Sequence, residues 1–294
     1  MREVATASEL RSILDAARAD GRAVGFVPTM GYLHAGHLSL MERAATECDV
    51  VLASIFVNPL QFGPTEDLDA YPRDIDRDRT LAEAAGVDVL FVPSSTEMYP
   101  EPVATTVSVA GVSERFEGAS RPTHFAGVAT VVAKLFNLSG PCRAYFGEKD
   151  FQQVAVVRRM VADLSIPVEV VACPTVREDD GLAMSSRNAY LSPDQRAAAP
   201  VLYRALTTGA ALIESGTGDA EEVRAAMREV IAAEPLAELD YLEVADPAAL
   251  EPVGLLGPYG GRPVRLLGAI RMGTTRLIDN VGAEVPEGVG DAAR

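Results

Sequence analysis

The chain has 294 residues, about twice the length of a typical domain, so it can hold two domains with sizeable cores. Its composition, 48% hydrophobic and 23% charged, is that of a globular protein and not of a disordered one. The formal net charge of −16 and the pI of about 4.6 argue against nonspecific binding to nucleic acid or to anionic lipid. A local basic pocket for an anionic ligand remains compatible with these values.

The lack of a recognisable targeting segment and the spacing of the cysteines predict a reducing environment away from the membrane. The first 21 residues lack the apolar segment of a signal peptide, and the longest apolar runs have only the length of a strand. Cys48, Cys142 and Cys173 are far apart and form no CxxC pair, so they are expected to be small core residues without disulfides. Reduced thiols favour a cytoplasmic location.

The first 175 residues alternate between helical and strand patterns. Thr6 and Glu9 form a capping pattern ahead of a helix that ends near Gly21. Further helices are predicted over 36–48, 74–85, 127–138 and 150–164. Apolar strands are predicted over 23–28, 49–57, 87–93, 143–147 and 167–174, with a short strand-like piece at 105–109 in an otherwise irregular segment, 94–125. Apolar strands that alternate with helices predict a doubly wound, Rossmann-like parallel sheet for a domain over 1–175.

The pattern changes from Ser192 onward. An Ala-rich helix opens on Ser192-Pro193-Asp194, and a second helix is predicted over 221–234. Strands follow over 239–246 and within 262–281. Two helices followed by strands predict a smaller α+β carboxyl-terminal domain over 176–294, with a disordered tail from about residue 285.

Polar clusters follow several strands of the predicted sheet. They are PTMGYLHAGH (28–37), NPLQF (58–62), GEKD (147–150) and VREDDGLAMSSRN (176–188). Since the carboxyl ends of parallel strands lie at one edge of a sheet, we expect a ligand site there.

His34 and His37 are two of the three histidines in the chain, which leaves three interpretations. Zinc would need a further protein ligand, and only His124 remains as a histidine. Two hydrogen-bonded histidines in a loop are a second possibility. A phosphate site is the third, because the pair precedes a helix whose free N–H groups and dipole favour anions, and Gly36 leaves room for close approach. An imidazole that titrates near pH 7 could then supply charge or a proton.

The HxGH pattern resembles the signature of the nucleotidyltransferase superfamily. The second half of that signature, a KMSKS-like loop, is expected where MSSRN (184–188) stands; both lysines are missing, but two hydroxyls and a guanidinium remain to hold pyrophosphate. FVNPLQFGPTEDLDAYPRD (56–74), RPTHFAGV, GEKDFQQ and PTVREDDGLAMSSRN extend the resemblance to the pantothenate synthetase family from about residue 20 to 193.

The resemblance implies ATP-dependent condensation of D-pantoate with β-alanine through a pantoyl adenylate, a step of pantothenate and coenzyme A biosynthesis. It implies catalytic roles for His37, His34 and Lys149. It implies substrate contacts from Gln61, Gln153 and Asn58, with Arg121 and His124 near that pocket. The ATP-binding residues it implies are Met30, His34, Gly36, His37, Gly147, Glu148, Lys149, Asp150, Val176, Met184, Ser185, Ser186 and Arg187.

The resemblance also implies Mg²⁺, a homodimer and a carboxyl-terminal domain that acts as a lid. Many members carry two adjacent acids where this chain has Arg77-Asp78, so no protein ligand to the metal is assigned. Two alternatives stay open: another HxGH adenylyltransferase that acts on a small phosphate ester, and a nucleotide sensor without catalysis.

Overall fold

The computed structural model describes residues 1–64 and 68–289. The chain divides into two compact units, Met1–Thr175 and Val176–Arg294, each with its own hydrophobic core. Each unit is described by itself.

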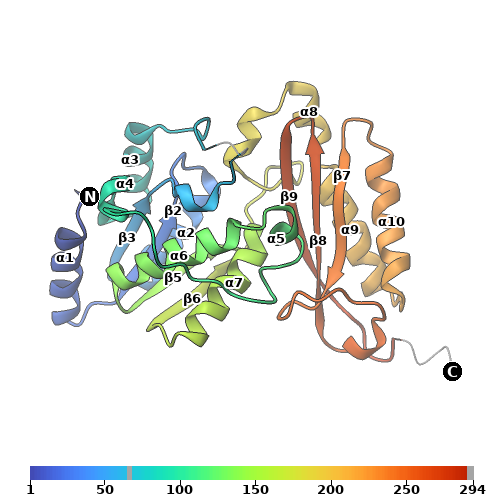
Figure 1. Ribbon diagram of the computed structural model, residues 1–294. Coiled ribbons are helices and arrows are strands. Elements are labelled where there is room, and N and C mark those ends of the chain that lie inside the picture. Colours follow the sequence, from blue (N-terminus) through green and yellow to red (C-terminus); the bar gives the residue numbers. More distant parts are fainter. Residues whose placement is uncertain (65–67, 290–294) are drawn as a thin grey trace. The chain divides into compact units, whose positions relative to one another are not determined.

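Unit 1 is built on a six-stranded sheet whose strands all run parallel (Figure 1). The strand order is β1-β4-β3-β2-β5-β6. The strands are β1 (Arg2–Val4), β2 (Val24–Thr29), β3 (Val50–Ile55), β4 (Val89–Phe91), β5 (Cys142–Gly147) and β6 (Val168–Cys173). The predicted doubly wound sheet is therefore confirmed.

Helices cover both faces of this sheet, because successive side chains of a buried strand point to opposite faces. Phe26 packs in one core with α1 (Ala7–Ala19), α6 (His124–Ser139) and α7 (Phe151–Asp163). Its neighbour Val27 packs in the other core, with α2 (Ala35–Glu47) and α3 (Ile75–Ala84). Two short helices, α4 (Ser95–Met98) and α5 (Glu117–Ser120), lie in the segment predicted to be irregular.

Unit 2 is a three-stranded antiparallel sheet packed against helices (Figure 1). The strands β7 (Glu238–Ala245), β8 (Pro263–Met272) and β9 (Thr275–Glu284) lie in that order. The helices are α8 (Pro193–Ala198), α9 (Val201–Glu214) and α10 (Ala220–Ala232). Leu206 of α9, Met227 of α10 and Leu266 of β8 are buried in its core, so the predicted α+β architecture is confirmed.

Several local predictions are wrong. Residues 105–109 form no strand; the amide of Val107 donates to Thr130 Oγ1, a side chain of α6. The helix predicted from Ser192 is two helices, since Pro200 interrupts it between α8 and α9. β1 was not predicted, because three residues carry too little periodicity to be recognised.

Burial also differs from expectation in two places. Cys173 is buried, whereas Cys48 and Cys142 are only partly buried. Val285 is 1% exposed and exchanges backbone hydrogen bonds with Gly261 and Arg262, so the packed part of the chain reaches at least this residue. Val289 is also packed against the unit 2 core, and residues 290–294 of the predicted disordered tail lie outside the described residues.

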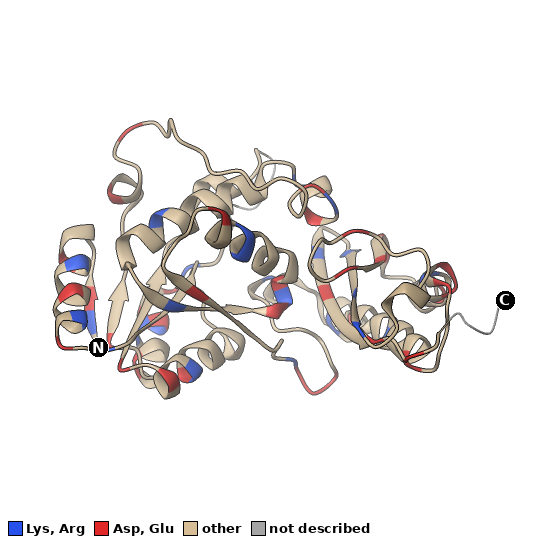
Figure 2. Cartoon of the chain, turned by 90° about the horizontal axis from the view of Figure 1, so that it is seen from below, with Lys and Arg blue, Asp and Glu red and all other residues tan. Residues whose placement is uncertain are grey.

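Acidic and basic positions are interspersed along the helices of both units (Figure 2). Within 1–64 and 68–289, no helix is long and apolar enough to cross a membrane.

Candidate active site

The candidate site lies where the order in which successive strands join the sheet reverses. From β2 the chain proceeds to β3 and β4 on one side, and it later resumes at β5 on the other side of β2. The carboxyl ends of β2 and β5 therefore flank a topological switch point, where ligands bind in open α/β sheets. The segment of His34 and His37 follows β2, and the 3₁₀ turn η2 (Glu148–Asp150) follows β5.

His34 and His37 together cap the amino terminus of α2. His34 is the N-cap residue, and its Nδ1 accepts a hydrogen bond from the amide of Gly36 at 3.2 Å. The Nδ1 of His37 accepts from the amide of His34 at 3.4 Å, which completes a reciprocal capping box. The two ring centroids lie 4.1 Å apart, so the imidazoles stand side by side at the helix start.

These contacts define the tautomer of both rings. A nitrogen that accepts an N–H bond carries no proton, so the proton of each neutral ring is on Nε2. Nε2 lies across the ring from the nitrogen that caps the helix. The cap therefore leaves the Nε2–H of both rings unused, at a helix start whose dipole favours an anion.

Both histidines are neutral at pH 7. Burial is the main cause that lowers the pKa of His34 to about 4; the charges of Lys149 and Arg77 contribute to this net shift, and Asp150 opposes it. Burial likewise lowers the pKa of His37 to about 3, with His34 as the next cause. The expectation that these imidazoles titrate near pH 7 does not hold for the free protein, in which they are donors without charge. The same causes place the cations Lys149 and Arg77 close enough to act on His34.

Asp78 holds the segment between β2 and α2 in place. Its two carboxylate oxygens accept the amides of Tyr32 and Leu33, each at 2.7 Å, and the side chain is 1% exposed. Tyr32 has a φ of 51°, a left-handed conformation that is unfavourable for a bulky residue and needs such support. Gly31 has no room for a side chain, since a Cβ there would lie 2.9 Å from Asp78 Oδ2. No motif or spacing in the sequence indicates this role of Asp78.

The amides after β3 form a connected group. Asn58 is 1% exposed; its Nδ2 donates to Gln61 Oε1 and to the carbonyl of Gly127, both at 3.1 Å. Its Oδ1 accepts from Tyr99 Oη at 2.9 Å and from the amide of Leu60. These bonds make Asn58 a support for Gln61, whose Nε2 lies 3.1 Å from Met30 Sδ.

Arg121 and His124 support the same turn, η1 (Pro59–Gln61), through its backbone. The carbonyl of Gln61 accepts from Arg121 at 3.3 Å and from His124 Nδ1 at 3.0 Å. A Cβ on Gly127 would lie 2.2 Å from the carbonyl oxygen of Leu60, so α6 approaches η1 as closely as only glycine allows. The sequence placed Arg121 and His124 near the substrate pocket, and the structure connects them to Gln61.

The loop after β5 carries the remaining predicted residues of unit 1. Lys149 is half-buried, and its Nζ lies 3.4 Å from Asp150 Oδ1. A Cβ on Gly147 would meet no atom within 4 Å, so space is open beside this residue. Gln152, to which the resemblance assigns no role, is buried; its Nε2 donates to the carbonyls of Val112 and Arg115, and its Oε1 accepts from the amide of Glu117. Its neighbour Gln153 is only partly buried.

The other predicted residues, Val176, Met184, Ser185, Ser186 and Arg187, belong to unit 2. The amide of Met184 donates to the carbonyl of Val176 at 3.0 Å, and Ser185 Oγ accepts from the amide of Arg187 at 3.3 Å. Ser185 thereby caps the 3₁₀ turn η3 (Ser186–Tyr190). The structure brings these five residues together with one another.

Among the described residues, no group of three or more His, Cys, Asp or Glu side chains could hold a metal ion. The zinc interpretation of the histidine pair thus gains no additional ligand from residues 1–64 and 68–289.

Comparisons with known proteins point to one family. The sequence profile of the family described as pantoate-beta-alanine ligase matches residues 2–282. The chain is 55% identical to the pantothenate synthetase of Brucella anthropi over 280 residues, which cover 95% of this chain and 96% of that protein. It is 56% identical to the pantothenate synthetase of Chloroflexus aurantiacus over 280 residues, covering 95% of this chain and 97% of that protein.

Solved structures agree in fold. The pantothenate synthetase of Thermus thermophilus is 55% identical, with a TM-score of 0.90 over 97% of this chain and 100% of that chain. The pantoate-beta-alanine ligase of Francisella tularensis, complexed with beta-gamma ATP and beta-alanine, is 33% identical. It has a TM-score of 0.78 over 96% of this chain and 97% of that chain.

Proposed function

The chain belongs to the pantoate-beta-alanine ligase family, and we propose that it joins D-pantoate to β-alanine with ATP, giving pantothenate, AMP and pyrophosphate. The chain is accordingly an enzyme of the ligase class that serves pantothenate biosynthesis. The family match over nearly the whole chain disfavours an adenylyltransferase for phosphate esters, and it equally disfavours a sensor without catalysis.

The reaction proceeds in two displacements. A carboxylate oxygen of pantoate attacks the α-phosphorus of ATP, and the bond from that phosphorus to pyrophosphate breaks, which yields pantoyl adenylate. The amine of β-alanine then attacks the acyl carbon, the bond to AMP breaks, and the amine loses a proton. Neither displacement needs a covalent enzyme nucleophile, so the protein contributes positioning and charge stabilisation.

The observation that carries this proposal is the pair of Nε2–H donors at the start of α2. Their Nδ1 atoms are committed to the helix cap, so both donors are held in one orientation before any ligand arrives. The positive end of the helix dipole and the charges of Lys149 and Arg77 act on the same place. Such an arrangement stabilises the negative charge that develops on phosphate oxygens during attack.

Other residues would complete the ATP site and the acid site. Met30, Gly36, Gly147, Glu148 and Asp150 would line the nucleotide, with Asp150 accepting from a ribose hydroxyl. Val176, Met184, Ser185, Ser186 and Arg187 would complete the ATP site, with the two hydroxyls and the guanidinium holding pyrophosphate.

Gln61 and Gln153 would bind pantoate through amide groups that do not titrate. Asn58 would hold the amide of Gln61 in the orientation that the substrate needs.

We propose that Mg²⁺ binds together with the triphosphate of ATP. Since the described residues contain no cluster of metal-binding side chains, the triphosphate and water would supply most of its ligands. Bound there, the ion would neutralise phosphate charge. We further propose a cytoplasmic homodimer, which the family resemblance supports.

Two assays test the proposal. Formation of pantothenate with equal amounts of AMP and pyrophosphate must require pantoate, β-alanine and ATP together; ADP or a nucleotide-coupled product would contradict it. Exchange of labelled pyrophosphate into ATP must require pantoate and proceed without β-alanine. If the exchange required β-alanine as well as pantoate, a pantoyl adenylate intermediate would be ruled out.

A further inference from the structure

The segment Met184–Arg187 directly follows a tight hairpin in unit 2, formed by residues 177–183. Arg177 and Ala183 pair as an antiparallel bridge, and the amide of Glu178 donates to the carbonyl of Leu182 at 2.9 Å. The hairpin turns at Gly181, which has a φ of 93°, and Asn188 Nδ2 returns to the carbonyl of Ala183 at 3.1 Å. The position of the hairpin therefore determines where the hydroxyls and the guanidinium of residues 185–187 stand.

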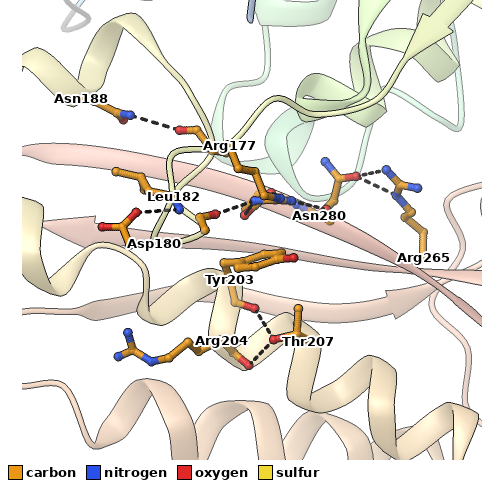
Figure 3. Close-up of polar contacts among 12 residues, drawn as sticks. Arg177, Asp180, Leu182, Asn188, Tyr203, Arg204, Thr207, Arg265 and Asn280 are labelled. Carbon is orange, nitrogen blue, oxygen red and sulfur yellow. Dashed lines mark hydrogen bonds and ion pairs between the residues drawn. The ribbon is translucent and has the colours of Figure 1, made fainter. Parts of the chain in front are cut away.

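Arg177 fastens this hairpin to β9. Its two terminal nitrogens form a bidentate pair with Asp279, at 2.6 and 2.9 Å. The same nitrogens donate to the carbonyl of Gly181 at 3.0 Å and to the carbonyl of Asn280 at 3.4 Å (Figure 3). Asp279 is 5% exposed and also accepts the amide of Asn280, so the carboxylate is fixed within β9.

Helix α9 provides the second contact of Arg177. The guanidinium carbon lies 3.9 Å from the centroid of the Tyr203 ring, at the distance of a cation–π pair (Figure 3). A Cβ on Gly181 would lie 2.3 Å from Tyr203 Cδ1, so the tip of the hairpin also rests on this ring. The hairpin is thus held between a strand and a helix of the unit 2 core.

A second anchor is much weaker. Arg196 pairs with Asp180 at 2.5 Å and with Glu178 at 3.3 Å, but all three side chains are substantially accessible to solvent. Exposed pairs contribute little, about 0–1 kcal/mol. Arg177 and Asp279 therefore carry the attachment.

We propose that Arg177 and Asp279 are a positioning pair, which sets the place of residues 184–187 for the triphosphate of ATP. This inference rests on the proposed function of the Met184–Arg187 segment. The pair buries charge, and buried ion pairs are often no more stabilising than apolar residues of the same size, so its use is in orientation. Neither residue needs to touch the nucleotide for this role.

The test compares this pair with another ion pair of the same unit. Asp279→Asn and Arg177→Lys each remove the bidentate contact and keep the approximate size of the side chain. Glu243→Gln is the control, because Glu243 forms a partly buried pair with Arg224 at 2.6 Å in the same unit, between α10 and β7. All variants are made in the full chain and assayed below their melting temperatures.

We expect Asp279→Asn and Arg177→Lys to lower kcat/KM for ATP, and pyrophosphate exchange, by about 10- to 100-fold, the cost of a small misplacement. KM for β-alanine should stay unchanged. Hydrogen exchange at the amides of Glu178, Gly181 and Met184 should rise about tenfold. Glu243→Gln should lower the melting temperature without changing kcat/KM for ATP or hydrogen exchange in the hairpin.

Three results would overturn the proposal: unchanged kcat/KM for ATP in both variants, unchanged hydrogen exchange in the hairpin, or an equal kinetic loss in Glu243→Gln. Hydrogen exchange needs no turnover, so it judges the attachment of the hairpin independently. Failure of the native chain to form pantothenate would refute the proposed function instead.

Discussion

The two nitrogens of each imidazole at the start of α2 have different roles: one caps the helix, and the other is the proposed phosphate donor. Nδ1 accepts a backbone N–H of the cap, and Nε2–H is the donor that we propose for phosphate. Since an asparagine amide imitates Nδ1 and a glutamine amide imitates Nε2, the two tasks of His37 can be separated by substitution.

We expect His37→Asn to keep the helix cap and lose the phosphate donor, so kcat should fall about 10²–10³-fold with little change in melting temperature. His37→Gln can either accept from the His34 amide, as Gln195 at the same helix position accepts from the Ser192 amide, or reach the place of Nε2, so its residual kcat should be higher than that of His37→Asn. Steady-state kinetics and thermal melts of both variants check this. A kcat that is lower in His37→Gln than in His37→Asn would contradict it.

The lowered pKa values of the histidines predict a pH dependence of stability. In the unfolded chain both rings titrate near the ordinary value of about 6.5, whereas in the native chain they titrate at about 4 and about 3. Between pH 6.5 and 3 the unfolded chain binds more protons, so the free energy of unfolding must fall as the pH falls through this window.

Proton NMR of the ring C–H signals, assigned with single variants of the three histidines, measures these values directly. Midpoints for His34 and His37 above pH 6 in the free protein would refute the neutral pair. Bound ATP should raise both midpoints, because phosphate charge favours the protonated ring.

Asp78 predicts an effect on the site from a residue that touches no ligand. Asp78→Asn leaves one acceptor for the two amides of Tyr32 and Leu33, and an unpaired buried N–H costs about 1–3 kcal/mol. We expect a lower melting temperature together with a reduced kcat. Asp49→Asn is the control, since Asp49 also accepts one amide, that of Ala23, at the opposite end of β2. Equal kinetics for both variants would exclude a role of Asp78 in the site.

At the scale of elements, the approach of α6 to η1 positions Gln61. Gly127→Ala places a methyl group within 2.6 Å of the Gln61 amide, and relief of such overpacking costs about 1–3 kcal/mol. We expect a raised KM for pantoate and a lower melting temperature. Gly254→Ala, where an added Cβ meets nothing within 4 Å, should change neither. An unchanged KM for pantoate in Gly127→Ala would show that η1 tolerates the displacement.

Elements with strong local patterns were predictable, and contacts between distant segments were not. The apolar runs of β2, β3, β5 and β6 identify a parallel sheet, and the topology then places the polar loops at one edge. The clamp from Asp78 to Tyr32 spans 46 residues, and the pair of Arg177 with Asp279 spans 102. Neither contact follows from a period or a spacing, because it depends on how whole elements pack.

For the whole molecule, the scarcity of metal ligands predicts how Mg²⁺ binds. Among residues 1–64 and 68–289, no group of three or more His, Cys, Asp or Glu side chains could hold a metal ion, so the proposed Mg²⁺ is expected to bind together with the nucleotide. We expect millimolar Mg²⁺ to leave the melting temperature of the nucleotide-free protein unchanged, and Mg²⁺ with ATP to raise it. Titration calorimetry that detects Mg²⁺ binding without nucleotide would contradict this.

The uncharged histidine pair has a consequence for inhibitor chemistry. Two neutral N–H groups held at a fixed spacing recognise acceptor oxygens, whether or not those oxygens carry charge. In the proposed site, a compound that replaces the reacting phosphate with an uncharged group bearing two acceptor oxygens would keep both of these contacts. It would give up only the attraction of Lys149 and Arg77, and it would avoid the large desolvation that a polyanion undergoes when it leaves water.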